Sequence, residues 1–299
     1  MGIMPYNCDY NFAKKASVLL FILVLVGAVY IVATRYNTQV REIISSPTVI
    51  KVVPESSDIK TKRFMQQRND VSRQLNQMKQ LYGQQSCEQL KLQQTSGKTV
   101  DSRVSENGGW CSDASSPESK AHMWDQGFST ALSKFLAGKE VASFGDGPGQ
   151  YKKHLDSLGQ VKIYTAYDGA PYCETVTKGT VKFLDLTAPQ YGLPAYDWVV
   201  SVEVGEHIPA KFEDIYLDNL ARHAREGLVL SWAVPGQGGL SHVNNKALVD
   251  VIAQLNKRGF EIDKTGSEPL RQASSFSWLK GNIYTYKRVD PKTFIEEDV

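Results

Sequence analysis

Glycines stand at alternate positions, Gly145, Gly147 and Gly149, directly after the apolar stretch 141–144. Glycine lets a chain turn tightly and lets a ligand come close to the backbone, and the helix predicted to follow would offer free N–H groups at its first turn. Asp168 follows the next apolar stretch, 19 residues after Gly149, where a carboxylate can accept hydrogen bonds from both hydroxyls of a ribose. This spacing indicates a site for a nucleotide-like ligand. The alternatives are a tight turn without a ligand and a helix cap at Asp168.

Two more acidic residues follow apolar stretches further along the chain. Asp185 comes after residues 180–184, and Glu203 comes after residues 196–202. If these stretches are parallel strands, both carboxylates lie at the C-terminal edge of the sheet, where ligands of open α/β sheets bind. Asp185 could otherwise cap a turn at residues 187–189, and Glu203 could be a solvated strand end.

Candidates for proton transfer lie near the same edge: Glu203, Glu206, His207 and His242. Histidine has an ordinary pKa close to neutral and suits a general base, although His207 stands just before Pro209 and could be structural. His242 lies in a glycine-rich loop, residues 232–245, which is either an acceptor-binding loop or a plain surface loop. Since no cysteines and histidines have the spacing of a zinc site, we expect no metal ion.

Short apolar runs alternate with helical patterns from about residue 120 onwards. The predicted strands are residues 140–144, 162–167, 180–184, 196–202, 228–233, 260–264 and 283–287. The predicted helices are residues 124–135, 149–157, 209–224 and 245–258. Such alternation requires crossover connections, so we predict an α/β, Rossmann-like fold with a mostly parallel sheet and helices on both faces.

The N-terminal region contains a run of 18 residues, 16–33, without a charged side chain. At about 1.5 Å per residue this run nearly spans a hydrocarbon core of roughly 30 Å. We therefore predict a short tail at 1–15 and a transmembrane anchor at 16–34, with a cleaved signal peptide or a buried helix as alternatives. The short tail favours a cytosolic N-terminus, as in a type II protein of the Golgi or endoplasmic reticulum.

Residues 35–110 are predicted to form a linker, with no sustained periodicity over 37–62, and then a helical stem. Ten glutamines occur between residues 66 and 94. One helical face of the stem is apolar: Val71, Leu75, Met78 and Tyr82. We expect a solvated stalk, with self-association of stalks as the alternative.

Cys87 and Cys111 are separated by 24 residues and flank a polar stretch. They could form a disulfide if this part of the chain is lumenal, and they are two free thiols otherwise. The α/β domain is predicted at 111–288, followed by an acidic tail at 289–299.

The composition is that of an ordinary globular protein, since 41% of the 299 residues are hydrophobic, 22% are charged and the net charge is +2. These values exclude a wholly disordered chain and a multi-span membrane protein. A charge balance this even gives no reason to expect a nucleic-acid partner.

Four segments of the α/β region resemble the successive motifs of class I S-adenosylmethionine-dependent methyltransferases: Ser-Phe-Gly-Asp-Gly-Pro-Gly, Ala-Tyr-Asp-Gly, Phe-Leu-Asp-Leu and Glu-Val-Gly-Glu-His-Ile-Pro. The resemblance covers roughly residues 120–288. With its anchor and stem, the whole chain resembles the membrane-anchored methyltransferase-like proteins of animals. The resemblance implies a seven-stranded sheet of order 3-2-1-4-5-7-6 with an antiparallel last strand, and S-adenosylmethionine as the cofactor.

The resemblance also implies roles for single residues. The three glycines of the loop line the methionine and ribose part of the cofactor. Asp168 holds the ribose hydroxyls, and Asp185 reaches the adenine amino group with Leu186 beside the ring. Glu203 faces the methionine end.

At one position the sequence departs from the family pattern. The family often has an acidic residue two positions before the first glycine, and this position is Ser143 here. Asp146, between the first two glycines, either supplies the missing charge or only fills the turn. We predict methyl transfer to an unidentified acceptor. The alternatives are a non-catalytic module that retains the fold, a type II glycosyltransferase and, from the glycine loop, a dehydrogenase.

Overall fold

The structure is a computed structural model that describes residues 34, 57–97, 104–111, 122–289 and 294. The chain divides into two units, Met1–Ser56 and Ser57–Val299. Within the described residues, no helix combines the length and the apolar character needed to cross a membrane. The predicted anchor at 16–33 lies outside the described residues, as do the N-terminal tail and most of the acidic tail.

Seven strands form one mixed sheet in the order β3-β2-β1-β4-β5-β7-β6, which is the class I methyltransferase fold. The strands are β1 (Glu140–Phe144), β2 (Ile163–Asp168), β3 (Val181–Phe183), β4 (Tyr196–Ser201), β5 (Ala224–Ser231), β6 (Phe260–Asp263) and β7 (Ile283–Arg288). Only β7 runs antiparallel to its neighbours. The predicted strand order is therefore confirmed, and the largest difference in bounds is the earlier start of β5.

Ten helical segments are present in the described residues: α2 (Ser57–Thr95), α3 (Gln126–Phe135), α4 (Gln150–Leu158), α5 (Cys173–Thr177), η2 (Gly205–His207), η3 (Ala210–Phe212), α6 (Glu213–His223), α7 (Leu248–Asn256), α8 (Lys264–Ala273) and α9 (Ser277–Asn282). The helix predicted from Pro209 starts instead with the single turn η3, and α6 follows. α8 and α9 were not predicted, because glycine, serine and proline between β6 and β7 resemble a loop.

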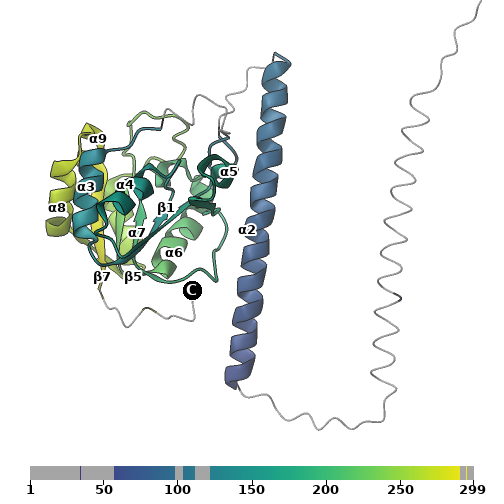
Figure 1. The fold of residues 1–299 in the computed structure, drawn as a ribbon, viewed down its shortest axis with the longest axis horizontal. Helices are drawn as coiled ribbons and strands as arrows, with labels where there is room; N and C mark the ends of the chain where they lie inside the picture. Colours follow the sequence, from purple (N-terminus) through teal and green to yellow (C-terminus); the bar gives the residue numbers. More distant parts are fainter. Residues whose placement is uncertain (1–33, 35–56, 98–103, 112–121, 290–293, 295–299) are drawn as a thin grey trace, which may run out of the picture. The chain divides into compact units, whose positions relative to one another are not determined.

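The sheet separates two hydrophobic clusters, and helices cover both faces (Figure 1). Side chains alternate between the faces along β1 because successive residues of a strand point in opposite directions. Val141 packs with α3, α4, α8 and α9, whereas Ala142 and Phe144 pack with α6 and α7. The carboxyl ends of β1, β2 and β4 thus lie side by side at one edge of a buried sheet.

The long helix α2 belongs to the same compact unit as the sheet and lies beside it (Figure 1). Three polar side chains donate to backbone carbonyls beside β3 at 3.0–3.1 Å: Ser72 to Pro189, Asn76 to Phe183 and Gln84 to Pro171. Val71, Met78 and Tyr82 of the predicted apolar face remain exposed. Two expectations are corrected: the helix begins at Ser57, inside the predicted linker, and it is a docked element instead of a solvated stalk.

The fully buried carboxylate of Asp125 ties two helices together. Its Oδ1 caps α3 by accepting from the Phe128 N–H, and its Oδ2 accepts from the Ser274 hydroxyl and from the N–H groups of Ser275 and Phe276. Burial favours the neutral acid, but the hydrogen bonds outweigh it and hold the pKa of Asp125 below its ordinary value.

We expect Asp125→Asn to lower the free energy of unfolding by about 2 kcal/mol at pH 7. The amide NH₂ group replaces one of the two carboxylate oxygens and cannot accept the hydrogen bonds that this oxygen accepts. A lowered pKa in the folded state adds stability above the ordinary value of 3.8, and this stability is lost as the pH falls through the folded pKa. The wild type should therefore lose its advantage over Asp125→Asn in urea unfolding below pH 4, whereas an equal difference at all pH values would contradict this role.

Candidate functional site

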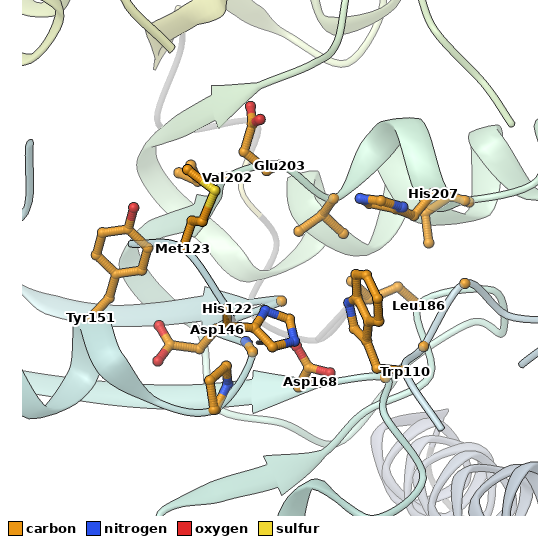
Figure 2. Close-up of a pocket in the computed structure, with 18 of the residues that line it drawn as sticks. Trp110, His122, Met123, Asp146, Tyr151, Asp168, Leu186, Val202, Glu203 and His207 are labelled. Atoms are coloured by element: carbon orange, nitrogen blue, oxygen red, sulfur yellow. Dashed lines mark hydrogen bonds between the residues drawn. The ribbon is translucent and has the colours of Figure 1, made fainter. Parts of the chain in front are cut away.

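A cavity of about 280 Å³ opens at the carboxyl ends of β1, β2 and β4. Figure 2 shows Trp110, His122 and Asp168 on one wall and Glu203 and His207 on the opposite wall. The predicted site residues that line it are Gly145, Asp146, Gly147, Asp168, Leu186, Glu203 and His207. The position at the carboxyl ends of parallel strands is the usual ligand site of an open α/β sheet.

The glycine loop packs closely against Val204 at Gly145 and is open toward the cavity at Gly147. Gly145 has a φ of +99°, and a Cβ there would lie 2.2 Å from a methyl group of Val204. A Cβ on Gly147 would meet only the His122 ring, at 3.5 Å, so this position is open toward the cavity. Gly149 departs from the expectation: it does not line the cavity but caps the start of α4, with the Cβ position 2.9 Å from Val181.

Asp168 is held in place by the backbone of two loops. Its Oδ2 accepts from the Gly147 N–H and its Oδ1 accepts from the Ala170 N–H, both at 2.8 Å. Burial raises the pKa of Asp168, and these hydrogen bonds together with the nearby His122 oppose the rise. Because a carboxylate can accept about four hydrogen bonds, two acceptor positions remain for a ligand on the cavity side.

Asp146 both fills the turn and lines the cavity (Figure 2). Its carboxylate accepts from the Tyr164 hydroxyl at 3.1 Å and from the Lys152 N–H at 3.3 Å. Burial raises the pKa of Asp146 to about 7, although the hydrogen bond from Ser143 opposes the rise. Ser143 and Asp146 therefore share one polar cluster where the family pattern has an acidic residue.

Asp185 does not reach the cavity, contrary to the role that the resemblance implies. Its Oδ1 accepts from both the N–H and the hydroxyl of Thr187, at 2.8 and 2.6 Å, and its Oδ2 lies 3.8 Å from the Lys79 ammonium of α2. The carboxylate thus caps the turn after β3 and anchors α2. Leu186, the next residue, does line the cavity.

A loop from outside the predicted domain also contributes to the cavity wall. Residues 107–110 line it, and this loop ends at Cys111, which forms a disulfide with Cys87 of α2. The pairing of Cys87 and Cys111, one of two open alternatives in the sequence, is confirmed. The Asn107 amide donates to the Gly169 carbonyl at 3.1 Å, and the Trp110 ring lies 5.0 Å from the His122 ring.

Sequence reasoning missed Trp110, His122 and Tyr151 as cavity residues. Trp110 precedes a cysteine in a segment that contains two glycines, which was the available signal. Burial lowers the pKa of His122, although the nearby Asp168 carboxylate opposes this effect. His122 is therefore expected to be a neutral ring at pH 7 that can donate one hydrogen bond and accept another.

Glu203 stands at the end of β4 with a φ of +59°, a backbone conformation that is uncommon outside glycine. The Ser231 hydroxyl accepts from the Glu203 N–H at 2.7 Å and donates to Glu203 Oε1 at 2.8 Å. Burial raises the pKa of Glu203, and the hydrogen bond from Ser231 opposes the rise. These contacts fix the carboxylate at the cavity wall (Figure 2).

The structure brings the other three candidates for proton transfer together. Ligating atoms of Glu206, His207 and His242 all lie within 4.8 Å of one another. Burial raises the pKa of Glu206 to about 8, with a further contribution from the Glu203 carboxylate. Burial and the nearby His242 lower the pKa of His207 to about 4, so this ring is neutral at pH 7. His207 lines the cavity, whereas Glu206 and His242 do not.

No family model and no curated protein sequence matches the chain. Among solved structures, the chain is similar to magnesium protoporphyrin IX methyltransferase from Synechocystis PCC 6803 with bound SAH, with 20% identity, 55% of this chain and 83% of that chain covered, and a TM-score of 0.42. It is also similar to CalS10, a SAM-bound amino pentose methyltransferase from Micromonospora echinaspora. The identity is 12%, the match covers 57% of this chain and 94% of that chain, and the TM-score is 0.44. A third is the CcbJ methyltransferase from Streptomyces caelestis (10% identity, 59% and 94% covered, TM-score 0.44).

Proposed function

We propose that this chain transfers a methyl group from S-adenosylmethionine to an acceptor. The observation that carries the proposal is the cavity at the carboxyl ends of β1, β2 and β4, in a sheet with the strand order of the methyltransferase fold. The Asp168 carboxylate and the open Gly147 position face the same cavity. Among the alternatives, the strand order favours a methyltransferase over a glycosyltransferase or a dehydrogenase.

The cavity residues fit the chemistry of this cofactor. Asp168 keeps two acceptor positions beyond its bonds to the backbone, which suits a pair of ribose hydroxyls. Leu186 and the Trp110 ring offer apolar surface for the adenine. Glu203 offers a carboxylate for the ammonium group of the methionine end.

When bound, S-adenosylmethionine would supply a methyl group on a positively charged sulfur, and transfer to the acceptor would break the methyl–sulfur bond and leave a neutral thioether. The protein contributes mainly the alignment of the two reactants. A base is needed only if the acceptor carries a proton. Of the four predicted candidates, Glu203 and His207 line the cavity and could serve such an acceptor. Since the His207 ring is neutral at pH 7, its one free electron pair can accept a hydrogen bond or bind a cation.

Calorimetric titration of the full-length chain with S-adenosylmethionine tests this proposal. We expect saturable binding with one ligand per chain. A parallel titration with NAD⁺ and with a nucleotide sugar covers the dehydrogenase and glycosyltransferase alternatives. If S-adenosylmethionine does not bind at millimolar concentration, the enzyme proposal fails and a non-catalytic module takes its place.

We also propose that residues 16–33 anchor the chain in an endomembrane with the folded unit on the lumenal side. The Cys87–Cys111 disulfide supports this location, because disulfides persist in oxidising compartments. Alkaline carbonate extraction should leave the full-length chain in the membrane pellet. Self-association through the exposed apolar face of α2 stays a second proposal, which the molecular mass measured by sedimentation tests.

A further inference from the structure

We propose that Glu206, His207 and His242 form a binding site for a divalent transition-metal ion, with Zn²⁺ as the first choice. This proposal departs from the expectation of no metal in the sequence analysis. It depends on one side chain of the cavity wall, His207, and on two side chains beside it, Glu206 and His242, and does not depend on the identity of the cofactor.

The distances between the three side chains suit one ion. A ligating atom of each residue lies within 4.8 Å of the other two. In a tetrahedral zinc site with bonds of about 2.0–2.1 Å, ligand atoms lie roughly 3.4 Å apart. Small changes in side-chain torsion angles would therefore bring all three onto one ion, and the His207 and His242 rings are already close, with 5.1 Å between their centres.

The buried polar atoms of this cluster lack well-formed hydrogen bonds to the described residues. Glu206 is fully buried, and neither of its carboxylate oxygens accepts a well-formed hydrogen bond from a side chain or backbone group among the described residues. The nearby N–H groups of Glu206 itself and of Ala233 give the carboxylate only partial compensation. The buried Nδ1 of His242 has no hydrogen-bond partner among these residues either. An acidic side chain that is buried without a partner costs several kcal/mol as an anion, by the general cost of burying an unpaired charge. A cation between Glu206 and His242 would satisfy all three atoms at once.

Backbone hydrogen bonds hold the loop of His242 next to the segment that contains Glu206 and His207. η2 places Glu206 and His207 after β4, and the loop that follows β5 carries His242. The Glu206 carbonyl accepts from the N–H groups of Val243 and Asn244 at 2.9 and 3.0 Å. Because β4 and β5 are neighbours in the sheet, this clamp holds the loop of His242 against η2.

The His207 ring has the tautomer expected of a metal ligand. Its Nδ1 lies 3.3 Å from the Ser241 carbonyl, and since a carbonyl only accepts, Nδ1 carries the proton. The other nitrogen, Nε2, then holds the free electron pair. A metal-binding histidine commonly donates its second N–H to a backbone carbonyl in this way, which fixes both the tautomer and the ring.

Two imidazole nitrogens and one carboxylate favour Zn²⁺, Fe²⁺, Co²⁺ or Mn²⁺ over Ca²⁺ or Mg²⁺, which prefer oxygen ligands. Three protein ligands leave one position of a tetrahedral ion for water or for a substrate atom. Since His207 belongs to both the cluster and the cavity wall (Figure 2), the ion would border the cavity.

The test uses the full-length chain with its disulfide intact, stripped of metal with a chelator and dialysed. Titration with Zn²⁺ and with Mn²⁺, followed by calorimetry and by elemental analysis of the dialysed protein, should give one ion per chain. A hundredfold excess of Zn²⁺ over its dissociation constant should raise the melting temperature by roughly 5 °C or more.

Glu206→Gln and His242→Gln should each weaken Zn²⁺ binding by at least about a hundredfold, since removal of partners one shell further out already costs about 10–100-fold. Glu206→Gln keeps the size of the buried side chain, and His242→Gln changes a partly exposed loop residue, so both variants should melt near the metal-free wild type. His122→Asn is the matched control, because His122 lines the same cavity outside the cluster, and it should bind Zn²⁺ like the wild type.

The proposal is overturned if the wild type binds neither ion, or if Glu206→Gln and His242→Gln bind Zn²⁺ as tightly as the wild type. It is also overturned if His122→Asn alone abolishes binding, which would place the ion elsewhere in the cavity. Metal binding without S-adenosylmethionine binding would support the site and contradict only the proposed methyl transfer.

Discussion

Asp168→Ala should weaken S-adenosylmethionine binding by at least about a hundredfold. The Asp168 carboxylate faces the cavity with two free acceptor positions, and each charge-assisted hydrogen bond to a ribose hydroxyl contributes roughly 1.5–3 kcal/mol. Two such bonds amount to about 3 kcal/mol or more, and about 1.4 kcal/mol corresponds to a tenfold change in affinity. Calorimetric titration of the wild type and the variant measures this difference, with thermal melting to show that the variant is folded.

Asp185→Asn serves as the matched control for this prediction. The resemblance gives Asp185 a role at the adenine, whereas the structure turns its carboxylate toward Thr187 and Lys79. We therefore expect this variant to bind S-adenosylmethionine with the affinity of the wild type while it loses some stability. Equal binding by Asp168→Ala and the wild type would show that the second motif is misassigned. A large loss in Asp185→Asn alone would restore the adenine role.

The sheet was predictable because its strands are short apolar runs that turns separate cleanly. All seven strands were predicted, and the motif resemblance supplied their order, including the antiparallel β7. α8 was missed because Gly266 and Pro269 look like loop residues, although the Asp263 carboxylate caps the helix and Pro269 lies within it. In α2 the apolar residues suggested a packing face, but Ser72, Asn76 and Gln84 make the contacts.

The site was predictable mainly where a residue closely follows a predicted strand, because the carboxyl ends of the parallel strands meet at the cavity. Gly147, Asp168, Leu186, Glu203 and His207 follow strands in this way and line the cavity. Asp185 and Gly149 occupy the expected positions in the chain but do not line the cavity. Asp185 caps the turn at Thr187, and Gly149 caps the start of α4. Trp110 could not be placed from sequence, because only the disulfide and the docking of α2 bring its loop to the cavity.

Replacing both cysteines, Cys87→Ser with Cys111→Ser, should lower the free energy of unfolding by about 3 kcal/mol. The disulfide joins residues 24 positions apart, and closing a loop of this length reduces the conformational entropy of the unfolded chain by about that amount. The same change releases the loop at 107–110 from α2, so the dissociation constant for S-adenosylmethionine should rise as well.

Urea unfolding and calorimetric titration, each with and without a reducing agent, measure the two effects of the disulfide separately. The reducing agent should destabilise the wild type and leave the double variant unchanged, since the one other described cysteine, Cys173, is a buried free thiol. If stability falls while cofactor affinity stays constant, the loop at 107–110 covers the cavity without contacting the ligand. If neither changes, the bond between Cys87 and Cys111 contributes nothing to the folded unit, and the attachment of this loop must come from other contacts, such as the Asn107–Gly169 hydrogen bond.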